Sequence, residues 1–494
     1  MSATIRYVQK DTAKVYSDSK KSKVLLELLW GDRVELLSNK KVDGLYKVKA
    51  RWAKNVYIDP ADIGNESLLE LYFIDVGQGD GILIVTPDRK HILIDGGYTR
   101  SKQPHGKSAA DFVDWKFYEE YGMDTIEIDA MISSHPDADH YGGLWDLLNP
   151  DLKDELDIKK TVVHNFYHAG VSWWRTKQKS RSLGTVKNGY LTDLLSGKTS
   201  LANGLKEDAD PKLQGEWAEF LKCVKKSGAN VQRLSYHPEK GFDYLPGFEQ
   251  DAPVQVKILG PIETTLNGKP ALKHLGSDSQ NTNGNSILLR LDYNKTRILL
   301  TGDLNQKSQQ YILESLSGSK QELAADITKA CHHGSDDCSF EFLQNVQAAA
   351  TIISSGDDET HAHPRPNIVA ASGVTGFRKV EADELITPLV YSTEISRSYR
   401  LGDPFKVSEA KYKTDSGTIA VSLTDEVTTK VTFMHTTSGA LKAKEKTKSL
   451  EQLKVVDGIV YGLVNVRTDG NRILCATMNE GKSKWEIKTF YSRF

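Results

Sequence analysis

The sequence predicts an α/β protein with a small all-β domain at its N-terminus and a short β appendage at its C-terminus. Residues 1–63 alternate strand-like runs with polar turns, as in "AKVYSD" and "GLYKVKA". From residue 70 onward, apolar strand-like runs such as "LYFIDVGQGDGILIV" alternate with helix-like stretches. Two more strand-like runs flank the turn "TDGN" near the end of the chain. This order of elements indicates α/β layers between two β units.

Residues 1–63 form the first predicted domain. Their spacing, with "GDRVELL" followed by "DGLYKVKA" and then "YIDPADI", resembles the bacterial SH3-like domains. The resemblance implies a module that targets a polymer or binds a protein partner. A structural cap on the next domain is the alternative interpretation.

The region 68–436 forms the second predicted domain. Its helix-like stretches include "SAADFVDWKFYEEYG", "GEWAEFLKCVKKSG" and "LNQKSQQYILESL". Its strand-like runs, among them "RILLTGD", "DITKACHHG" and "ATIISSG", end in polar residues. Because open α/β folds assemble their sites where strands end, we expect the functional residues at these ends.

The region 437–494 is predicted to be a linker followed by a β-hairpin appendage. The segment "HTTSGALKAKEKTKSLEQ", residues 435–452, is polar and rich in lysine, which is typical of linkers. The runs "GIVYGLVNVRTDGNRILCATM" and "SKWEIKTFYSRF" then favour a hairpin that turns at "TDGN".

The composition excludes several classes of protein. The 64 Lys and Arg side chains nearly balance the 66 Asp and Glu side chains, so the chain is not a globally basic nucleic-acid binder, although a local basic patch fits this total. The four cysteines form no CxxC pair, which argues against a disulfide framework. No run has the length and apolar character of a signal peptide or a membrane span, so we expect a soluble, cytoplasmic protein with no membrane partner.

The stretch "HPDADH", residues 135–140, concentrates metal-ligand side chains directly after the apolar run "IEIDAMISS". In an extended segment His135, Asp137 and Asp139 face the same way, and a turn would bring His140 beside them. Such groups would repel one another in a dry interior without a counterion, whereas neutral imidazoles and carboxylates are good ligands for Zn²⁺ or Mn²⁺. The stretch therefore predicts a site for divalent metal ions.

Two other strand-like runs supply side chains of the same kind. "ILLTGDL" ends a strand with Asp303, and "KACHHGS" ends one with His332 and His333. The stretches "FIDVGQGDGILI", "ILIDGG", "SSHPDADHYGG", "ILLTGDL" and "CHHGS" occur in this order. The order resembles the metallo-β-lactamase fold family, and most closely its ComEC-like members, over roughly residues 68 to 436.

The resemblance implies an αββα sandwich, in which two sheets lie between outer helices and a two-metal site lies along one edge. It also implies two sets of ligands and one bridging residue: His135 and Asp137 for the first ion, Asp139, His140 and His333 for the second, and Asp303 for both. A third ligand of the first ion is expected to be His168, because "YHAG" is similar to a stretch in relatives; His164 is the alternative.

The charges of this predicted site favour hydrolysis. Three carboxylates against two divalent ions leave a formal charge of about +1, which one bridging hydroxide would neutralise, and this hydroxide is the expected nucleophile. Asp137 stands where the commonest family pattern has histidine, and this harder, oxygen-richer first site makes Mn²⁺ more credible than it is in an all-histidine site. Asp80 and Asp95 are expected to orient the ligating histidines rather than to bind metal.

Other side chains are predicted to bind the phosphate of a substrate or to assist its leaving group. "NTNGNS", residues 281–286, favours a turn that offers the Asn283 and Asn285 amides and the Ser286 hydroxyl, with a solvated turn as the alternative. His332 can lean over the site and contact or protonate a phosphate. In "THAHPRP", the resemblance favours His363 near the metals, whereas His361 is expected at the surface. The predicted catalytic set is therefore Asp139, His332 and His363.

A basic stretch is predicted to track a phosphate backbone. Residues 171–188 contain five basic side chains, two tryptophans and no acid. Such a stretch can pair cations with phosphates while Trp173 or Trp174 stacks on a base; a solvated insertion with buried tryptophans is the alternative. The basic side chains assigned to this role are Arg175, Lys177, Lys179 and Arg181.

These observations predict a two-metal hydrolase that cleaves phosphodiester bonds, as a nuclease or phosphodiesterase whose partner is nucleic acid. One alternative is a metal-dependent hydrolase of a lactone, thioester or β-lactam. Another is a non-catalytic protein that binds partners and keeps a relic metal site. Phosphorylcholine-type esters of envelope polymers would be a variant of the first prediction.

Overall fold

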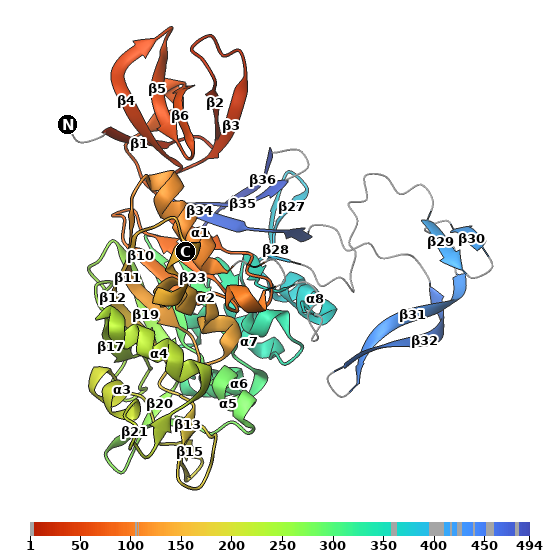
Figure 1. The fold of residues 1–494 in the computed structure, drawn as a ribbon. Coiled ribbons are helices and arrows are strands. Elements are labelled where there is room, and N and C mark those ends of the chain that lie inside the picture. The colour runs from red at the N-terminus through yellow and green to blue at the C-terminus, as the bar shows by residue number, and fades with distance from the viewer. Residues whose placement is uncertain are drawn as a thin grey trace.

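The computed structural model describes residues 4–103, 106, 108–356, 363–394, 410–414, 417–421, 427–437, 440–450, 459–479 and 484–494. Among these residues no helix combines the length and the apolar character needed to cross a bilayer. Figure 1 shows a small β domain standing at one end of a larger α/β body.

The N-terminal domain is a sheet of antiparallel strands, as predicted. In spatial order β3-β2-β6-β5-β4-β1-β7, its strands are β1 (Thr4–Val8), β2 (Thr12–Tyr16), β3 (Val24–Leu29), β4 (Arg33–Val42), β5 (Leu45–Ala50), β6 (Ala53–Ile58) and β7 (Ile63–Gly64). One 3₁₀ turn, η1 (Pro60–Asp62), precedes β7. Alternate residues such as Val15, Val48 and Val56 point inward and form a separate hydrophobic core. The resemblance to SH3-like domains stays a prediction.

Two large sheets form the α/β body. The first, in spatial order β17-β12-β11-β10-β9-β8-β34-β35-β36, contains β8 (Leu69–Phe73), β9 (Ile82–Val85), β10 (His91–Ile94), β11 (Thr125–Ser133), β12 (Lys160–His168), β17 (Asn230–Arg233), β34 (Val464–Thr468), β35 (Arg472–Asn479) and β36 (Lys484–Tyr491). The second, in spatial order β18-β19-β22-β23-β24-β25-β28-β33, contains β18 (Asp243–Tyr244), β19 (Val254–Gly260), β22 (Leu288–Tyr293), β23 (Thr296–Leu300), β24 (Ile327–Lys329), β25 (Ala350–Ile353), β28 (Leu389–Ser392) and β33 (Ile459–Tyr461).

Helices and short turns surround the sheets. The α-helices are α1 (Ala109–Trp115), α2 (Ala138–Leu148), α3 (Lys198–Gly204), α4 (Gly215–Ser227), α5 (Asp278–Gly284), α6 (Gln306–Ser315), α7 (Phe340–Val346) and α8 (Pro366–Thr375). A π-helical turn, η3 (Lys116–Tyr121), continues α1, and the 3₁₀ turns are η2 (Arg100–Lys102), η4 (Pro150–Glu155), η5 (Lys320–Leu323) and η6 (Cys331–Gly334).

The remaining strands form small sheets. They are β13 (Trp174–Arg175) with β16 (Lys212–Leu213); β14 (Val186–Lys187), β15 (Tyr190–Leu191), β21 (Lys269–Lys273) and β20 (Glu263–Leu266); β26 (Lys379–Glu381) with β27 (Glu384–Thr387); β29 (Ala410–Thr414) with β30 (Gly417–Val421); and β31 (Val427–Thr437) with β32 (Ala440–Leu450).

Three hydrophobic clusters show that the body has four layers. On β10, Ile92 and Ile94 point into a cluster shared with the second sheet, whereas Leu93 points to a cluster shared with α1, α2 and α4. On the second sheet, Leu299 of β23 points outward to α6 and α7. The order helix, sheet, sheet, helix agrees with the predicted sandwich, because each sheet buries both faces.

The predicted hairpin at "TDGN" is confirmed, because β34 pairs with β35 around that turn, but the C-terminal strands are not a separate appendage. β34 pairs along its whole length with β8, from Val464 opposite Phe73 to Thr468 opposite Leu69. β33 likewise pairs with β28 of the second sheet. The end of the chain therefore completes both large sheets, and sequence alone missed this because pairing partners some 390 residues apart leave no local pattern.

The predicted linker at 435–452 is also corrected. Residues Val427–Thr437 and Ala440–Leu450 form the two antiparallel strands of a hairpin, β31 and β32. A lysine-rich composition suggested a linker, but alternating residues such as Lys442, Lys444 and Lys446 suit a strand equally well. Residues 451 and 452 lie outside the described residues. The domain boundaries themselves stay predictions.

Candidate metal centre

Several strands end at one edge of the sandwich, and each delivers a polar side chain there. Asp95 follows β10, His135 follows β11, and Asp303 follows β23. The two sheets are joined at this edge by a hydrogen bond from the Ile287 amide to the carbonyl of Ser134, at 3.0 Å. Residues far apart in the sequence therefore meet at one place, as the strand-end rule predicts.

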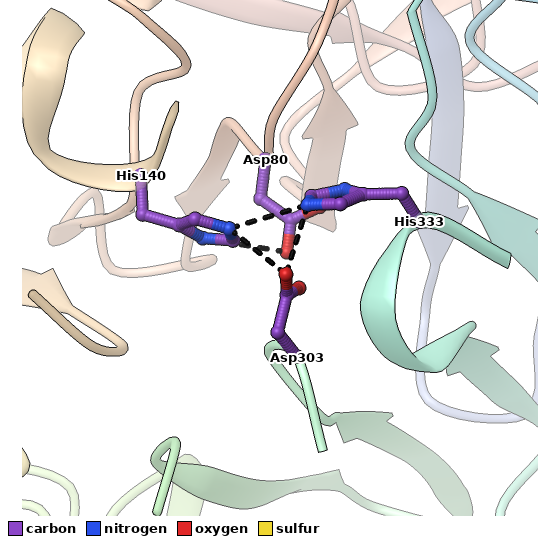
Figure 2. Close-up of side chains that lie close together, drawn as sticks. All are labelled: Asp80, His140, Asp303 and His333. Atoms are coloured by element: carbon purple, nitrogen blue, oxygen red, sulfur yellow. Dashed lines mark hydrogen bonds and ion pairs between the residues drawn. The ribbon is translucent and has the colours of Figure 1, made fainter. Parts of the chain in front are cut away.

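Four buried side chains form the centre of the site: Asp80, His140, Asp303 and His333. One nitrogen or oxygen atom from each lies within 4.8 Å of the others. Figure 2 shows the two imidazoles and the Asp303 carboxylate pointing toward one another. Nε2 of His333 lies 2.9 Å from Asp303 Oδ2, and Nε2 of His140 lies 3.3 Å from the same oxygen.

Hydrogen bonds at the far side of each ring set the tautomers. His140 Nδ1 lies 2.9 Å from Asp95 Oδ2, and His333 Nδ1 lies 3.1 Å from the carbonyl oxygen of Ser354. Since both Nδ1 atoms face acceptors, they carry the protons, and each Nε2 presents its lone pair to the centre. The two Nε2 atoms are only 3.3 Å apart. Two lone pairs and a carboxylate at this distance require a shared cation, so the residues fit a metal ion.

The electrostatics agree with this interpretation. Burial opposes ionisation of Asp303, but His333, His140 and Lys329 outweigh it and hold the pKa of its carboxyl well below the ordinary value. Burial also disfavours the charged form of His140, yet Asp303 and Asp95 raise its pKa well above the ordinary value. The centre therefore holds a cation strongly, whether a proton or a metal ion occupies it.

Asp80 and Lys329 lie behind the ligand atoms. Asp80 Oδ1 is 3.3 Å from Nδ1 of His333, and its other oxygen forms an ion pair with Lys329. The buried Lys329 ammonium also donates to the carbonyl of Gly302 at 2.8 Å and lies 3.4 Å from Asp303 Oδ1. The Asp303 carboxylate thus turns Oδ1 to the lysine and Oδ2 to the histidines.

The other residues of the "HPDADH" stretch surround this centre. Nε2 of His333 lies 3.6 Å from Asp139 Oδ2. Nε2 of His135 lies 3.5 Å from Asp137 Oδ2, and the His135 and His140 rings are 4.0 Å apart. The structure therefore brings all four polar side chains of the stretch to the site, with Asp137 accepting a hydrogen bond from Thr282 Oγ1 at 2.9 Å.

The two candidate histidines of β12 differ clearly. His168 ends the strand opposite Ser133 of β11, and its ring is buried with neither nitrogen hydrogen bonded. Burial, reinforced by Arg233, lowers its pKa to about 3, so the ring is neutral and its lone pair is free. His164 is exposed on the strand. An unpaired buried imidazole suits a metal ligand, which favours His168 over His164.

A cavity of about 580 Å³ opens onto the centre. Its walls are formed by Gln78, Tyr98, His135, Asp137, Asp139, Ser279, Asn283, Asp303, His332, His333, Ser335, Asp336, His363 and Arg365. His332 and His363 have ring centroids 5.8 Å apart. His332 has a left-handed backbone conformation, with φ of 47°, that few non-glycine residues adopt, and its Nε2 lies 3.2 Å from the amide nitrogen of Asn283. His361 lies outside the described residues.

The stretch 281–286 is corrected by the structure. It is the end of helix α5 rather than a turn, because Ser277 and Gln280 cap the start of that helix. Asn283 lines the cavity, but Asn285 donates to the carbonyl oxygens of Lys273 and Asn281. Ser286 Oγ accepts a hydrogen bond from the Asp303 amide at 3.1 Å, so it positions a candidate ligand and does not line the described cavity.

The basic stretch lies beside the site rather than inside it. Trp174 is buried and donates to the carbonyl of Asp193, so it is not free to stack on a base. Trp173 donates at 3.1 Å to the carbonyl of Pro136, inside the "HPDADH" stretch, and the Arg181 guanidinium lies 3.8 Å from its ring centroid. All five cations of this stretch are exposed, namely Arg175, Lys177, Lys179, Arg181 and Lys187, and none of them lines the described cavity.

Sequence reasoning missed several residues of the site. Lys329 reads as an ordinary strand residue in "DITKACHHG", although a lysine within a buried strand is itself a signal. Gln78, whose amide donates to Asp139 Oδ2 at 3.3 Å, lies between two glycines of "GQGD" and gave no such signal. Arg365, by contrast, stands out in "THAHPRP" beside His363, and the structure places both on the cavity wall.

Comparisons with known proteins agree with this geometry. The family model described as "Metallo-beta-lactamase superfamily" matches residues 74–210. ComE operon protein 3 of Bacillus subtilis (strain 168) is 24% identical over 324 residues, which cover 64% of this chain and 32% of that protein. The chain thus spans about a third of the length of this curated relative.

Three solved structures are also similar. A metallo-beta-lactamase mutant from Cronobacter sakazakii has 14% identity and a TM-score of 0.24, covering 53% of this chain and 77% of that one. A metallo-beta-lactamase from Hirschia baltica has 12% identity and a TM-score of 0.21, covering 63% of this chain and 95% of that one. A protein of unknown function from Enterococcus faecalis V583 has 12% identity and a TM-score of 0.25, covering 66% and 70%. TM-scores of 0.21 to 0.25 are too low to show that these structures share a fold with this chain.

The "HPDADH" stretch lies within the residues that the family model matches, and its side chains reach the buried histidine and aspartate cluster. Residues 74–210 match the metallo-beta-lactamase superfamily, and the chain is a distant homologue of ComE operon protein 3.

Proposed function

We propose that this chain is a metal-dependent hydrolase of phosphodiester bonds, and that its substrate is nucleic acid. The observation that carries the proposal is the lining of the cavity: every side chain that the structure places on its walls has a polar group. Lactone, thioester and β-lactam substrates need apolar surface for their carbon skeletons, whereas a phosphodiester is an anion that binds through hydrogen bonds and cations.

We further propose two metal positions, for Zn²⁺ or Mn²⁺. His135, Asp137 and His168 would hold the first ion, Asp139, His140 and His333 the second, and Asp303 both. Divalent ions bound there supply a nucleophile derived from water at neutral pH and neutralise charge that develops on phosphorus. The neutral His168 ring and the Nε2 atoms of His140 and His333, which face the centre of the site, support this assignment.

The remaining side chains have proposed roles in binding and proton transfer. Asn283 lies beside His332 on the cavity wall, where its amide holds Nε2 of that ring. We propose that His332 and His363 contact the phosphate and protonate the leaving oxygen, and that Arg365 adds a positive charge to the same wall. Beyond the cavity, the exposed cations beside Trp173 would bind flanking phosphates.

Metal content and hydrolysis test this proposal together. Elemental analysis of the purified chain is expected to give two metal ions per molecule. Bis-p-nitrophenyl phosphate and linear DNA or RNA are expected to be cleaved with added Mn²⁺ or Zn²⁺. Asp139→Ala is expected to lower cleavage at least 100-fold, whereas Asp151→Ala, at an exposed aspartate outside the described cavity, is expected to change nothing.

Two other outcomes would overturn the proposal. Bound metal without cleavage of any phosphodiester would favour a lactone, thioester or β-lactam hydrolase. A chain without bound metal that kept its biological effect after Asp303→Ala would favour a partner-binding protein with a relic site.

A further inference from the structure

The N-terminal domain differs in charge from the rest of the chain. Residues 1–63 contain thirteen Lys and Arg against eight Asp and Glu, a formal charge of +5, whereas the whole chain carries -2. The remaining residues therefore carry about -7 in total, although residues 437–494, with eleven Lys and Arg against six Asp and Glu, also carry +5. The N-terminal domain is thus one of two positively charged regions on either side of a negatively charged one. Such an asymmetry attracts polyanions to that domain.

The positive charge gathers at the end of the domain that points away from the α/β body. Ser19, between β2 and β3, donates to Asp43, between β4 and β5, at 2.5 Å, so these two hairpin ends lie together. Five exposed lysines belong to them: Lys20, Lys21, Lys23, Lys40 and Lys41. Lys21 forms an ion pair with Asp59, at 3.3 Å, and the other four form no ion pair among the described residues. The opposite end of the domain contacts the body (Figure 1).

An aromatic row lies on the outer face of the same sheet. Tyr16 of β2 is opposite Tyr57 of β6, and Tyr57 is opposite Lys47 of β5, so the three side chains share one face. Their neighbours Val15 and Ile58 point into the core, which places the row outside. Both tyrosines are half-buried, and the Lys21 ammonium lies 5.4 Å from the Tyr16 ring centroid.

We propose that this face, made of Tyr16, Tyr57, Lys47 and the five lysines of the hairpin ends, binds single-stranded nucleic acid. The face combines flat rings with ammonium groups, of which only that of Lys21 is ion-paired among the described residues. On such a surface exposed bases stack while the phosphates meet the cations. Unstacked bases are available in single strands and not in a duplex. The inference rests on the proposed function, because the bound strand is the polymer that the metal centre cleaves.

The arrangement gives the domain a role in holding long substrates. A strand bound at the N-terminal domain reaches the cavity as an intramolecular partner, which raises its effective concentration there. A small ester does not contact the N-terminal domain while it occupies the cavity. The domain is therefore expected to lower the KM for polymers.

Binding without cleavage tests the inference. The full-length chain in EDTA is titrated against fluorescein-labelled 30-nucleotide single-stranded DNA, single-stranded RNA and duplex DNA, and fluorescence anisotropy is measured. Single strands are expected to bind more tightly than the duplex. Tyr16→Ala with Tyr57→Ala is expected to weaken single-strand binding at least tenfold, whereas the two Phe substitutions keep it, because a phenyl ring still stacks.

The lysines are tested by salt dependence. Replacing Lys20, Lys23, Lys40 and Lys41 by Gln is expected to reduce the slope of log K against log salt by up to about 3, since each phosphate contact contributes about 0.7 on a single strand. A matched variant removes four exposed lysines from the body, at Lys159, Lys160, Lys225 and Lys226, and is expected to keep the slope.

The inference fails if the two Ala substitutions leave binding unchanged in a folded protein, or if both lysine variants change the slope equally. It also fails if the face binds a protein partner and not oligonucleotides. Hydrolysis of bis-p-nitrophenyl phosphate by the wild-type chain tests the metal centre separately. Tyrosine-dependent binding without that hydrolysis would leave this inference standing and refute the proposed function.

Discussion

The carboxylate of Asp95 shows how single residues prepare the site. It accepts hydrogen bonds from His140 Nδ1 at 2.9 Å and from the Ser134 amide at 2.8 Å, with its backbone at a φ of 56°. One side chain therefore fixes both the tautomer of a candidate ligand and the path of the chain into "HPDADH".

Asp95→Asn is expected to lower metal affinity 10- to 100-fold, because its amide group would place N–H against one of the two donors. Asparagine tolerates the left-handed backbone, so the chain should still fold. Competition with a metal chelator measures the affinity. The matched control is Asp383→Asn, which makes the same exchange at an exposed residue with a φ of 64°; equal affinities in the two variants would contradict the role given to Asp95.

The buried histidine His91 gives a second prediction for a single residue, which concerns the pH dependence of stability. Its ring is buried against Phe117 and Tyr121, and burial, reinforced by Arg89 and Lys116, lowers its pKa to about 3. The unfolded chain binds a proton near pH 6.5 and the folded chain does not. The stability contributed by neutral His91 is therefore complete above pH 6.5 and is lost as the pH falls from 6.5 toward 3.

His91→Phe is expected to remove this loss. Between pH 7 and pH 5 the wild-type free energy of unfolding should fall by about 2 kcal/mol more than that of the variant. Urea unfolding at the two pH values measures the difference. Parallel pH profiles would show that His91 is protonated in the folded protein.

At the scale of elements, helix α2 must approach the loop after β10 very closely. A Cβ atom on Gly143 would lie 2.2 Å from the carbonyl oxygen of Gly96, and one on Gly142 would lie 2.3 Å from the Thr99 amide nitrogen. The first turn of the same helix, which begins at Ala138, carries Asp139 and His140. The two glycines therefore set the position of two candidate ligands through backbone contact.

Gly143→Ala is expected to destabilise the fold by about 1–3 kcal/mol and to lower metal affinity, because the helix must move away from the loop. Thermal unfolding and metal titration measure the two effects. Gly373→Ala, in helix α8, has no atom within 4 Å of its new Cβ and is expected to stabilise by about 0.5–1 kcal/mol. A stabilising effect at Gly143 as well would contradict the close approach.

At the scale of the whole molecule, a buried ion pair joins the N-terminal domain to the last strands. Asp32 Oδ1 lies 2.7 Å from Arg467 of β34, and Asp32 Oδ2 lies 2.7 Å from Arg51. Burial disfavours the charged form of Asp32, but Arg467 and Arg51 hold the pKa of its carboxyl well below the ordinary value. The domain is thus fixed to the body, and the face proposed to bind nucleic acid keeps a constant orientation.

Asp32→Asn is expected to cost about 3–5 kcal/mol, because it leaves two guanidinium groups without a buried counterion. Asp11→Asn breaks an ion pair with Arg472 that is partly exposed, and is expected to cost less than about 1 kcal/mol. Denaturant unfolding measures both, and limited proteolysis between the domain and the body reports their separation. Similar losses in the free energy of unfolding at Asp32 and Asp11 would show that the buried ion pair does not hold the N-terminal domain against the body.

Local patterns in the sequence determined helices α1, α4 and α6, the strand ends and the polar stretch at the site. The predicted helices around "ADFVDW", "EWAEFLKCVKK" and "QKSQQYILES" are confirmed, because each carries an apolar stripe at helical spacing that packs against a sheet. The side chains of "HPDADH" converge with Asp303 and His333 because each follows a strand that ends at the same edge. Such signals are carried by a few neighbouring residues.

Only the tertiary structure decided the features that depend on distant partners. The pairing of β34 with β8, the Asp32–Arg467 ion pair and the role of Lys329 behind Asp303 each join residues separated by many positions in the chain. The partner of Trp174 is set in the same way, by which groups remain unsatisfied once the chain is packed. The cap on α5 is different, because Ser277 and Gln280 are three residues apart and form a local signal that the sequence already contains. A hydrogen bond or ion pair depends on the position of both partners, whereas a sequence pattern records only one of them.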